Sequence, residues 1–532
     1  MRVRAGALVR VGLLRLWLFA PERRLNGTRW SLPAALAIGA ISALAFQPAG
    51  LWPLMVLAFA LLAELVARAP TLRGALITGW LFGLGQFVLG LNWIATAFTY
   101  QAAMPAWLGW VAVVLLSLYL AVYPALAAGL AWRFGRDRPL ALVLALAGGW
   151  AITEWLRAAI FTGFAWNPVG VALVDSGLIE ISAMIGTYGL SMLAVLTGGA
   201  VWLAWRQRLF PAVIIPLVVV LLWALPGAEV PDGSTTVRPI RVVQPNIGQQ
   251  DKWRPGFSDI AARRLADLSA QPERSEPRLL LWPEAAVTDP LEDERGEPYA
   301  GFARFERQRA ASAIRPGEYL LTGGIALLSP DGRFITGAAN SVFALDAEGD
   351  VAFRYDKAHL VPYGEYLPMR PLLSAIGLSR LAPGDVDFIP GPGPQTVALP
   401  GWGKVGFQIC YEIIFSGDVV DPNNRPDFIF NPSNDAWFGA WGPPQHLAQA
   451  RLRAAEEGLP VIRSTPTGIS AIIDARGRLT QSLPWRQAGV IDSQLPVAAL
   501  SPTLFARLGN WIPLTLAFAL LIGGIVLGGR RR

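Results

Sequence analysis

Eight runs of apolar residues, each about as long as a membrane-spanning helix, limit the fold of this 532-residue chain more than any other feature. A helix needs roughly 20 apolar residues to cross the ~30 Å hydrocarbon core of a bilayer. The composition agrees, because 53% of the residues are hydrophobic and the mean hydropathy is +0.41. We therefore predict a multi-pass membrane protein, with seven spans before a long polar segment and one after it. The runs lie near residues 31–48, 51–67, 75–98, 107–132, 139–159, 180–204, 210–227 and 509–528.

Arginines occupy every second loop between these runs, which predicts the orientation of the chain. The pattern places both termini in the cytoplasm and residues 231–500 outside it. A further apolar stretch, Val11–Ala20, has no small-residue cleavage site after it, so we expect it to lie on the membrane surface and not to act as a signal peptide. The orienting residues are Arg23, Arg24, Arg29, Arg68, Arg73, Arg133, Arg136, Arg138, Arg206, Arg208 and the closing run 530–532.

The segment from 231 to 500 has the pattern of a folded domain outside the membrane. Charged residues become frequent there, and short apolar runs alternate with helix-like stretches. A segment of about 270 residues suffices for one α/β domain. We therefore expect a membrane domain at 1–230, an outer domain at 231–500, and a last span with a basic tail at 501–532. Strands are predicted at 240–244, 279–282, 319–322, 341–345, 351–355, 403–409, 427–430, 461–463 and 470–473, and helices at 258–270 and 446–457.

Composition also excludes several classes of function. The net charge of +7 comes largely from the arginines beside the spans, so it gives no reason to expect a nucleic-acid partner. One cysteine and two histidines cannot build the usual zinc sites, so no metal is expected. The sequence contains no glycine-rich phosphate-binding loop, and no cofactor is expected.

Three ionisable residues follow strand-like runs in the outer segment. Glu284 comes after 279–282, Lys357 after 351–355, and Cys410, the single cysteine, after 405–409. Taken alone, each has an ordinary explanation as a loop carboxylate, a solvated charge or a buried thiol. Functional groups gather where strands end, however, and these three would form a working set. The carboxylate could take the thiol proton, while the ammonium lowers the pKa of the thiol and stabilises an oxyanion.

Three sequence blocks around these residues resemble the catalytic blocks of the nitrilase superfamily, in its order Glu, Lys, Cys. They are Trp282–Glu284, Tyr355–Tyr366 and Gln408–Glu412. Together with the spans, the wider pattern resembles the apolipoprotein N-acyltransferases, the membrane branch of that superfamily. The resemblance implies an αββα sandwich inserted in an eight-span helical bundle. Supporting blocks are 244–253, 434–439, 445–446 and 450–451, and Pro466 departs from the pattern, where an asparagine is expected.

The resemblance assigns Cys410 as nucleophile, Glu284 as general base and Lys357 as the residue that stabilises an oxyanion. Glu365 and Glu412 match further acidic positions of the active site. Because a buried ammonium needs partners, we expect these two carboxylates to hold Lys357 charged and oriented.

Further residues of the matching blocks are candidates for contact with substrate. The N–H group of Tyr411, directly after the nucleophile, is a plausible second donor to the oxyanion. Four aromatic residues, Trp253, Tyr363, Trp437 and Phe438, could line an acyl-chain pocket or a lid, or simply belong to the core.

The implied reaction moves an acyl chain in two steps, without a cofactor. Cys410 takes the acyl group of a phospholipid, by resemblance the sn-1 chain of phosphatidylethanolamine, as a thioester. The α-amino group of the diacylglyceryl-cysteine of a lipoprotein then accepts it. The implied location is the bacterial cell inner membrane, with the catalytic domain in the periplasm, and the chain is expected to be a monomer among membrane lipids.

Three other functions are consistent with part of the pattern. A membrane-anchored amidohydrolase would use the same triad with water as acceptor. A Cys-His protease would use His359 or His446 as base. A transporter would use the spans, although their few charges, Glu64, Glu154 and Arg157, offer little to line a pathway. We expect Glu154 and Arg157, three residues apart on one helix, to pair with each other.

Overall fold

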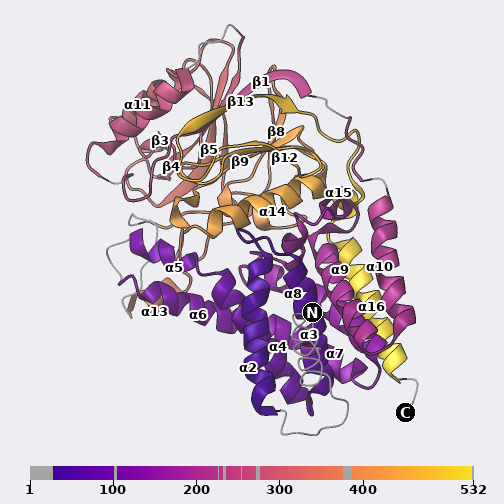
Figure 1. Ribbon diagram of the computed structural model, residues 1–532. Coiled ribbons are helices and arrows are strands. Elements are labelled where there is room, and N and C mark those ends of the chain that lie inside the picture. The colour runs from indigo at the N-terminus through magenta and orange to yellow at the C-terminus, as the bar shows by residue number, and fades with distance from the viewer. Residues whose placement is uncertain are drawn as a thin grey trace, which may run out of the picture.

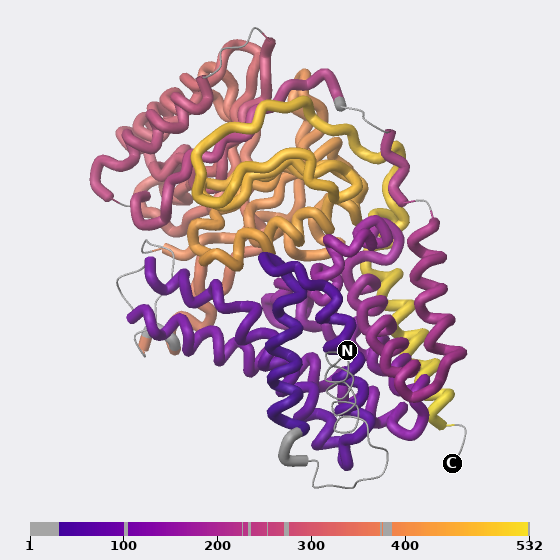
Figure 2. The backbone as a smooth tube through the Cα atoms, viewed as in Figure 1, coloured from indigo at the N-terminus to yellow at the C-terminus, as the bar shows by residue number. Residues whose placement is uncertain are grey.

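The computed structural model describes residues 28–529 except 101–104, 226, 232–234, 253, 271–275 and 376–385. A helical bundle forms one half of the molecule and a mixed α/β domain the other (Figure 1). The backbone builds most of the bundle first, then the α/β domain, and returns to the bundle with its last helix, α16 (Trp511–Gly529) (Figure 2). The surface segment predicted at 11–20 lies outside the described residues.

Helices occur at each of the eight positions predicted to span the membrane. Helices at three of these positions have only 15 or 16 residues, so their crossing remains a prediction: α2 (Thr28–Ser42), α3 (Pro53–Arg68) and α10 (Leu209–Ala224). Five stretches are long and apolar enough to cross a bilayer: α4 (Leu72–Gly90), α6 with α7 (Leu108–Gly135), α8 (Pro139–Ala159), η4 with α9 (Ile179–Trp205), and α16.

Small residues let the first helices of the bundle pack closely. A Cβ atom at Gly39 of α2 would lie 1.9 Å from the backbone oxygen of Phe82 on α4, and one at Gly85 would lie 2.1 Å from that of Leu36. Helices in a membrane gain stability mainly from such close backbone approach, because lipid offers little hydrophobic driving force between them. Glycine at these positions therefore sets the spacing between α2 and α4.

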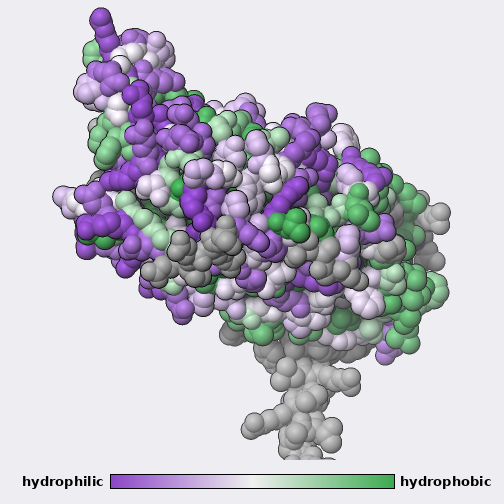
Figure 3. All heavy atoms as spheres, turned by 90° about the horizontal axis from the view of Figure 1, so that it is seen from above, coloured by the Kyte–Doolittle hydropathy of each residue, from purple (hydrophilic) through white to green (hydrophobic). Residues whose placement is uncertain are grey.

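Hydropathy is distributed over the surface as expected for a domain standing on a membrane-embedded bundle. Seen from the side of the α/β domain, polar residues cover most of the visible face and hydrophobic residues gather toward one edge (Figure 3). Several apolar side chains of α10 and α16 point outward, typical of surfaces that face lipid. Examples are Leu209, Phe210, Val213, Leu221, Trp511 and Ile522.

The buried charges of the bundle do not pair as predicted. Glu154 accepts hydrogen bonds from the backbone N–H of Val169 (2.8 Å) and the ring of Trp150 (3.3 Å), and Arg157 donates to the carbonyl oxygen of Trp166 (2.9 Å). Glu154 and Arg157 therefore form no direct ion pair, although each charge acts on the other through space. Both side chains instead bind backbone groups in the irregular segment that follows α8 and at the start of the 3-10 helix η3 (Val169–Leu173).

Two mixed sheets form the α/β domain. One has the order β13-β1-β2-β4-β5-β6 with β3 beside β4, and the other has the order β12-β11-β10-β9-β8-β7. The central strands β1, β2 and β4 are parallel to one another, and so are β8, β9 and β10. The strands are β1 (Thr235–Gln244), β2 (Leu279–Leu281), β3 (Pro290–Asp293), β4 (Tyr319–Leu328), β5 (Gly337–Leu345), β6 (Val351–Asp356), β7 (Thr396–Leu399), β8 (Gly403–Phe407), β9 (Phe428–Pro432), β10 (Val461–Ser464), β11 (Ala471–Ile473), β12 (Leu479–Ser482) and β13 (Gly489–Pro496).

The sheets pack face to face, with helices on their outer sides. One core lies between the sheets, and a second lies between the seven-stranded sheet and helices α11 (Phe257–Ala270) and α12 (Tyr299–Ala311). Helix α14 (Gly442–Glu457) covers the other sheet. All nine predicted strands are present. The strands β3, β7, β12 and β13 were not predicted because they lie at or near sheet edges and lack the apolar pattern of the central ones.

Helix α14 also joins the two halves of the molecule. Glu456 accepts hydrogen bonds from the N–H (2.5 Å) and hydroxyl (2.7 Å) of Thr187 on α9 and from the hydroxyl of Ser416 (2.8 Å). Its other oxygen pairs with Arg453 at 2.6 Å. Because all of these groups are buried, this ion pair with its hydrogen bonds fixes the α/β domain on the bundle.

We expect Glu456→Ala to destabilise the protein by about 3–5 kcal/mol, because the substitution leaves Arg453 charged and unpaired in a buried site. The measurement is thermal unfolding of the detergent-solubilised protein. Glu180→Ala is a matched control, since Glu180 joins the same halves through a solvent-exposed pair with Arg478 (2.6 Å) and should cost about 0–1 kcal/mol. Equal losses in both variants would contradict the role given to Glu456.

Candidate active site

Three loops that follow strands bring Glu284, Lys357 and Cys410 together. Glu284 lies three residues after β2, and Lys357 directly follows β6 of the same sheet. Cys410 lies three residues after β8 of the facing sheet and opens the short 3-10 helix η5 (Cys410–Ile414). The backbone φ angle of Cys410 is +51°. This left-handed conformation is unfavourable for a residue with a side chain, and such strain is typical of functional sites.

Lys357 is a fully buried ammonium group held by two carboxylates. Its Nζ donates to Oε1 of Glu365 at 2.9 Å and lies 3.8 Å from Oε1 of Glu284. Burial alone would lower the pKa of Lys357, but Glu365 and then Glu284 raise it above its usual range. The predicted role of Glu365 is therefore supported by direct contact, and Lys357 stays charged at neutral pH.

Glu284 has one oxygen held and one oxygen free. Asn340 on β5 donates to Oε1 of Glu284 (2.8 Å) and to Oε1 of Glu365 (2.9 Å). Within the described part of the chain, Oε2 of Glu284 is buried without a hydrogen-bond partner. A Cβ atom at Gly323 on β4 would lie 2.6 Å from the Cα of Glu284, so glycine there allows the close approach of this loop. Asn340 was missed because an asparagine inside an apolar strand carries no motif.

The thiol of Cys410 is protonated in the resting site. Burial raises the pKa of Cys410 well above its usual value, Glu284 raises it further, and Lys357 lowers it. At neutral pH a thiol of this kind reacts when a base removes its proton as the new bond forms, whereas alkylation by a reactive reagent at high pH follows the equilibrium fraction of thiolate. The free oxygen of Glu284 is available for that proton, and the ammonium of Lys357 can receive the developing negative charge.

Glu412 does not contact the ammonium of Lys357, contrary to prediction. Its Oε1 accepts from the hydroxyl of Tyr355 (2.9 Å) and from the N–H groups of Ala358 (2.7 Å) and His359 (3.1 Å), and its Oε2 accepts from the N–H of Ile409 (2.6 Å). Burial raises the pKa of Glu412 to about 7, against the opposing effects of the three backbone N–H donors and of the nearby positive charge of Lys357. Glu412 thus ties the backbone after Lys357 to the backbone before Cys410.

Of the five remaining predicted positions, the structure describes four. Tyr411 lies in the first turn of η5, where backbone N–H groups have no partner within the helix. Its hydroxyl donates to the carbonyl oxygen of Gly163 (3.4 Å). Trp437 and Phe438 face aromatic rings of the bundle, whereas Tyr363 is 49% exposed on the loop after Lys357. Trp253 lies outside the described residues. The substrate contacts of these residues remain predictions.

Neither histidine faces the thiol. Nε2 of His446 lies 3.0 Å from the carbonyl oxygen of Cys410, and Nε2 of His359 lies 2.9 Å from that of Thr162. Because a carbonyl oxygen only accepts, each of these nitrogens carries a proton and donates. Among the described residues, no hydrogen bond joins either imidazole to the thiol, so the Cys-His alternative has no geometric support.

A second buried lysine, Lys252, contacts the loop that carries Glu284. Nζ of Lys252 donates to the carbonyl oxygen of Ala285 at 3.1 Å, and Ala285 has a φ of +49°. Burial lowers the pKa of Lys252 to about 8, although the Glu284 carboxylate partly opposes the shift. Lys252 therefore supports the loop that carries Glu284 without touching the thiol in any described contact.

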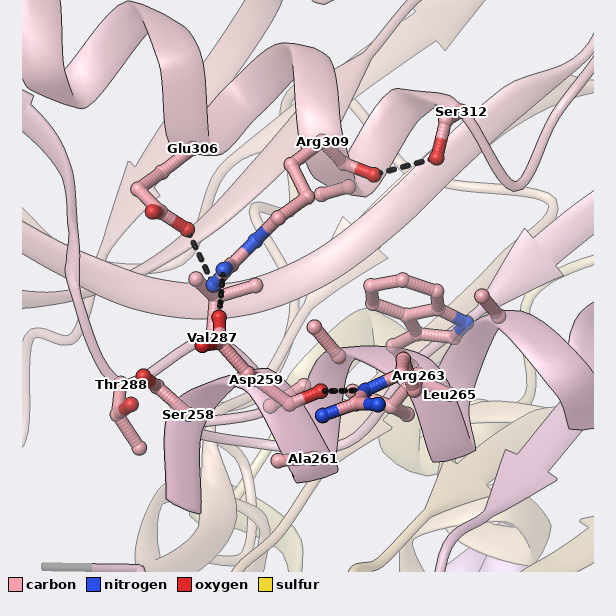
Figure 4. Close-up of a pocket in the computed structure, with 15 residues that line it drawn as sticks. Ser258, Asp259, Ala261, Arg263, Leu265, Val287, Thr288, Glu306, Arg309 and Ser312 are labelled. Carbon is pink, nitrogen blue, oxygen red and sulfur yellow. Dashed lines mark hydrogen bonds and ion pairs between the residues drawn. The ribbon is translucent and has the colours of Figure 1, made fainter. Parts of the chain in front are cut away.

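A cavity of about 390 Å³ lies apart from this cluster, between α11 and α12 (Figure 4). Its polar wall contains Glu306, which pairs with Arg309 at 2.6 Å, and Arg309 also pairs with Asp259 at 2.8 Å. No member of the Glu284–Lys357–Cys410 cluster lines it. Both carboxylates of this wall are therefore engaged in ion pairs with the guanidinium of Arg309.

Comparisons with known proteins cover both halves of the chain. Residues 38–200 match the family model of the apolipoprotein N-acyltransferase N-terminal domain, and residues 240–503 match that of carbon-nitrogen hydrolases. Over 524 residues the chain is 36% identical to the apolipoprotein N-acyltransferase of Rhodopseudomonas palustris, which covers 93% of this chain and 95% of that protein. The chain belongs to the apolipoprotein N-acyltransferase family.

A second apolipoprotein N-acyltransferase and a solved amidase structure are also similar to this chain. The apolipoprotein N-acyltransferase of Caulobacter vibrioides is 37% identical over 490 residues, covering 88% of this chain and 89% of that protein. Among solved structures, an amidase from Nesterenkonia sp. aligns at 17% identity with a TM-score of 0.36, covering 49% of this chain and 92% of that chain. The two apolipoprotein N-acyltransferases confirm, at the level of the family, the resemblance noted in the sequence.

We expect Glu284→Gln to increase the rate at which iodoacetamide alkylates Cys410 at pH 9 by about tenfold. The Glu284 carboxylate raises the pKa of the thiol, so its removal lowers that pKa, and one pKa unit is a factor of ten in thiolate below the pKa. The chain has a single cysteine, so alkylation reports on one site. The control is Glu306→Gln, which changes a buried carboxylate at the cavity between α11 and α12, lined by none of Glu284, Lys357 and Cys410, and should leave the rate unchanged. A slower or equal rate in Glu284→Gln would contradict the electrostatics of the site.

Proposed function

We propose that this chain transfers an acyl chain from a phospholipid to a lipoprotein through a thioester on Cys410. The observation that carries the proposal is the buried ammonium of Lys357 between Glu365 and Glu284, with the lone thiol beside them. Membership of the apolipoprotein N-acyltransferase family supports the choice of substrates. Glu284 is the general base, Lys357 stabilises the oxyanion, and Glu365 and Glu412 hold the surrounding loops.

In the first step, Cys410 attacks the ester carbonyl carbon of the phospholipid. The free oxygen of Glu284 takes the thiol proton as the carbon–sulfur bond forms. The negative charge on the carbonyl oxygen is stabilised by Lys357 and by the N–H of Tyr411. The bond between the acyl carbon and the glycerol oxygen then breaks, Glu284 returns the proton to that oxygen, and a lysophospholipid leaves.

In the second step, the α-amino group of a diacylglyceryl-cysteine attacks the thioester. Glu284 accepts a proton from the amine, and the oxyanion forms again beside Lys357. The carbon–sulfur bond breaks, the proton passes to the sulfur of Cys410, and the products are an amide and the free thiol. Two transfers through one thioester let the site hold one bulky lipid at a time. No nucleotide is required, since the ester already supplies the activated acyl group.

The site is proposed to work at the periplasmic surface of the bacterial inner membrane. Both substrates are anchored in the bilayer, which accounts for a catalytic domain at 231–500 held on the spans of 1–230 and 501–532. Eight spans with both termini in the cytoplasm would place Cys410 outside. Phosphatidylethanolamine is the proposed donor, and Tyr363, Trp437 and Phe438 are proposed to contact its chains.

The proposal is tested by mass spectrometry of the purified protein after incubation with phosphatidylethanolamine. The expected product is one acyl adduct on Cys410 that hydroxylamine removes and that a diacylated lipopeptide accepts at its α-amino group. An adduct lost to water at the same rate with or without lipopeptide would favour an amidohydrolase. Absence of any adduct would refute the thioester route.

A further inference from the structure

A buried histidine holds the backbone of the nucleophile without touching its sulfur. His446 lies on α14, is fully buried, and places Nε2 3.0 Å from the carbonyl oxygen of Cys410. Its other nitrogen, Nδ1, lies 2.9 Å from Oδ1 of Asp435 and 3.0 Å from Nη2 of Arg463. The ring is therefore fixed at both ends, and the proposed reaction uses neither end.

The partners of His446 are themselves held rigidly. Arg463 on β10 donates to both carboxylate oxygens of Asp435, at 2.8 and 2.7 Å. The same guanidinium donates to Asn431 (2.5 Å) and Ser433 (2.8 Å), which lie on and directly after β9. All of these side chains are buried. Two neighbouring strands thus orient the imidazole, as polar groups packed around a site commonly orient the groups that react.

The carbonyl that His446 binds belongs to a strained residue. Cys410 has a φ of +51°, and a left-handed residue relaxes unless its surroundings hold it there. On its amino-terminal side, Glu412 holds the N–H of Ile409. On its carboxyl-terminal side, His446 binds the carbonyl of Cys410 itself. These two contacts bracket the one residue whose side chain must point toward Glu284 and Lys357.

We propose that His446 is a positioning residue that keeps Cys410 in the left-handed conformation and so directs its thiol to Glu284 and Lys357. This inference deepens the proposed function and rests on it for the role of the thiol.

Helix α14 contacts the bundle through residues that precede and follow His446 in the sequence. Gln445 accepts from the ring of Trp166 at 2.8 Å and donates to the carbonyl oxygen of Gly90 at 3.3 Å. Gln449, one turn on, accepts from the N–H of Asn167 at 3.2 Å. Helix α14 is thus seated on the bundle by several separate contacts, and the imidazole reaches the backbone of the nucleophile from this helix.

The test measures whether Glu284 still affects the alkylation rate of the Cys410 thiol when His446 is replaced. Alkylation of Cys410 by iodoacetamide at pH 9 is measured in the full-length protein, with and without Glu284→Gln, in three backgrounds. In the wild-type background, Glu284→Gln should accelerate alkylation about tenfold. With His446→Leu the acceleration should fall below about twofold, because a thiol that has moved away from the Glu284 carboxylate is no longer affected by its charge. With His446→Gln, which keeps an N–H donor toward the carbonyl, the tenfold effect should return.

Two measurements separate positioning from general destabilisation. Gln449→Leu removes a buried amide from the same helix, so it should lower the melting temperature but keep the tenfold effect. Formation of the acyl adduct should slow by roughly 10–100-fold in His446→Leu, the scale expected from a displacement of about 1 Å. The inference would be overturned if Glu284→Gln accelerated alkylation tenfold in the His446→Leu background. It would also be overturned if Glu284→Gln caused no acceleration in the His446→Gln background, or none in any background. Since alkylation needs no lipid substrate, failure of the proposed function alone would leave the coupling intact.

Discussion

Replacement of Cys410 by alanine is expected to abolish acyl transfer, with a loss of at least about 10⁴-fold, the order seen when a catalytic nucleophile is removed. The chain has no second cysteine that could substitute for it. The side chain is small and nearly buried, so its truncation should change the free energy of unfolding by only about 1 kcal/mol. The measurement is transfer of a labelled acyl chain from phosphatidylethanolamine to a diacylated lipopeptide.

Cys410→Ser is the matched variant for this experiment. A hydroxyl has nearly the same volume as a thiol but is a far weaker nucleophile at neutral pH, so it should retain almost no transfer while packing as the wild type does. Thermal unfolding of both variants should stay within a few degrees of the wild-type midpoint. Substantial transfer by either variant would refute Cys410 as the acyl carrier.

Lys357→Met is expected to reduce acyl transfer by about 10²–10³-fold, the cost of losing one donor to an oxyanion. Methionine fills a similar volume without the charge. The substitution also leaves Glu365 and Glu284 buried without their shared cation, so one of them should take up a proton. The measurement is the rate of acyl-adduct formation on Cys410, which isolates the first step.

Lys252→Met serves as the control for Lys357→Met, because it removes a second buried lysine whose ammonium contacts the loop of Glu284 and not the thiol. It should reduce adduct formation by less than about tenfold, through the position of that loop. Equal losses in the two variants would contradict the assignment of the oxyanion to Lys357.

The sequence alone pointed to the candidate reactive residues, and each of them lies at most three residues after a strand. Apolar alternation located β2, β6 and β8, and the motif blocks named Glu284, Lys357 and Cys410. The structure adds the reason why strand ends matter here. The residues come from two facing sheets, and only the packing of those sheets brings the thiol to the ammonium.

Supporting residues were harder to predict because their roles depend on contacts between distant segments. Asn340 bridges two carboxylates from the interior of a strand, and Glu412 binds backbone groups instead of the ammonium. His446 looked like a candidate base, yet its proton points to a carbonyl oxygen. The predicted Glu154–Arg157 pair failed for the same reason, since the nearby backbone after α8 competes for both side chains.

The sequence by itself determined the class of this protein: apolar runs long enough for a bilayer, a polar segment between them, and three reactive groups at strand ends. These properties follow from local composition and periodicity, which need no knowledge of neighbours in space. Only the tertiary structure decided which oxygen of Glu284 is free, how Lys357 stays charged, and what holds Cys410 in its left-handed conformation. Those properties arise from burial and from hydrogen bonds between segments far apart in the chain, where the strength of every charge depends on what surrounds it.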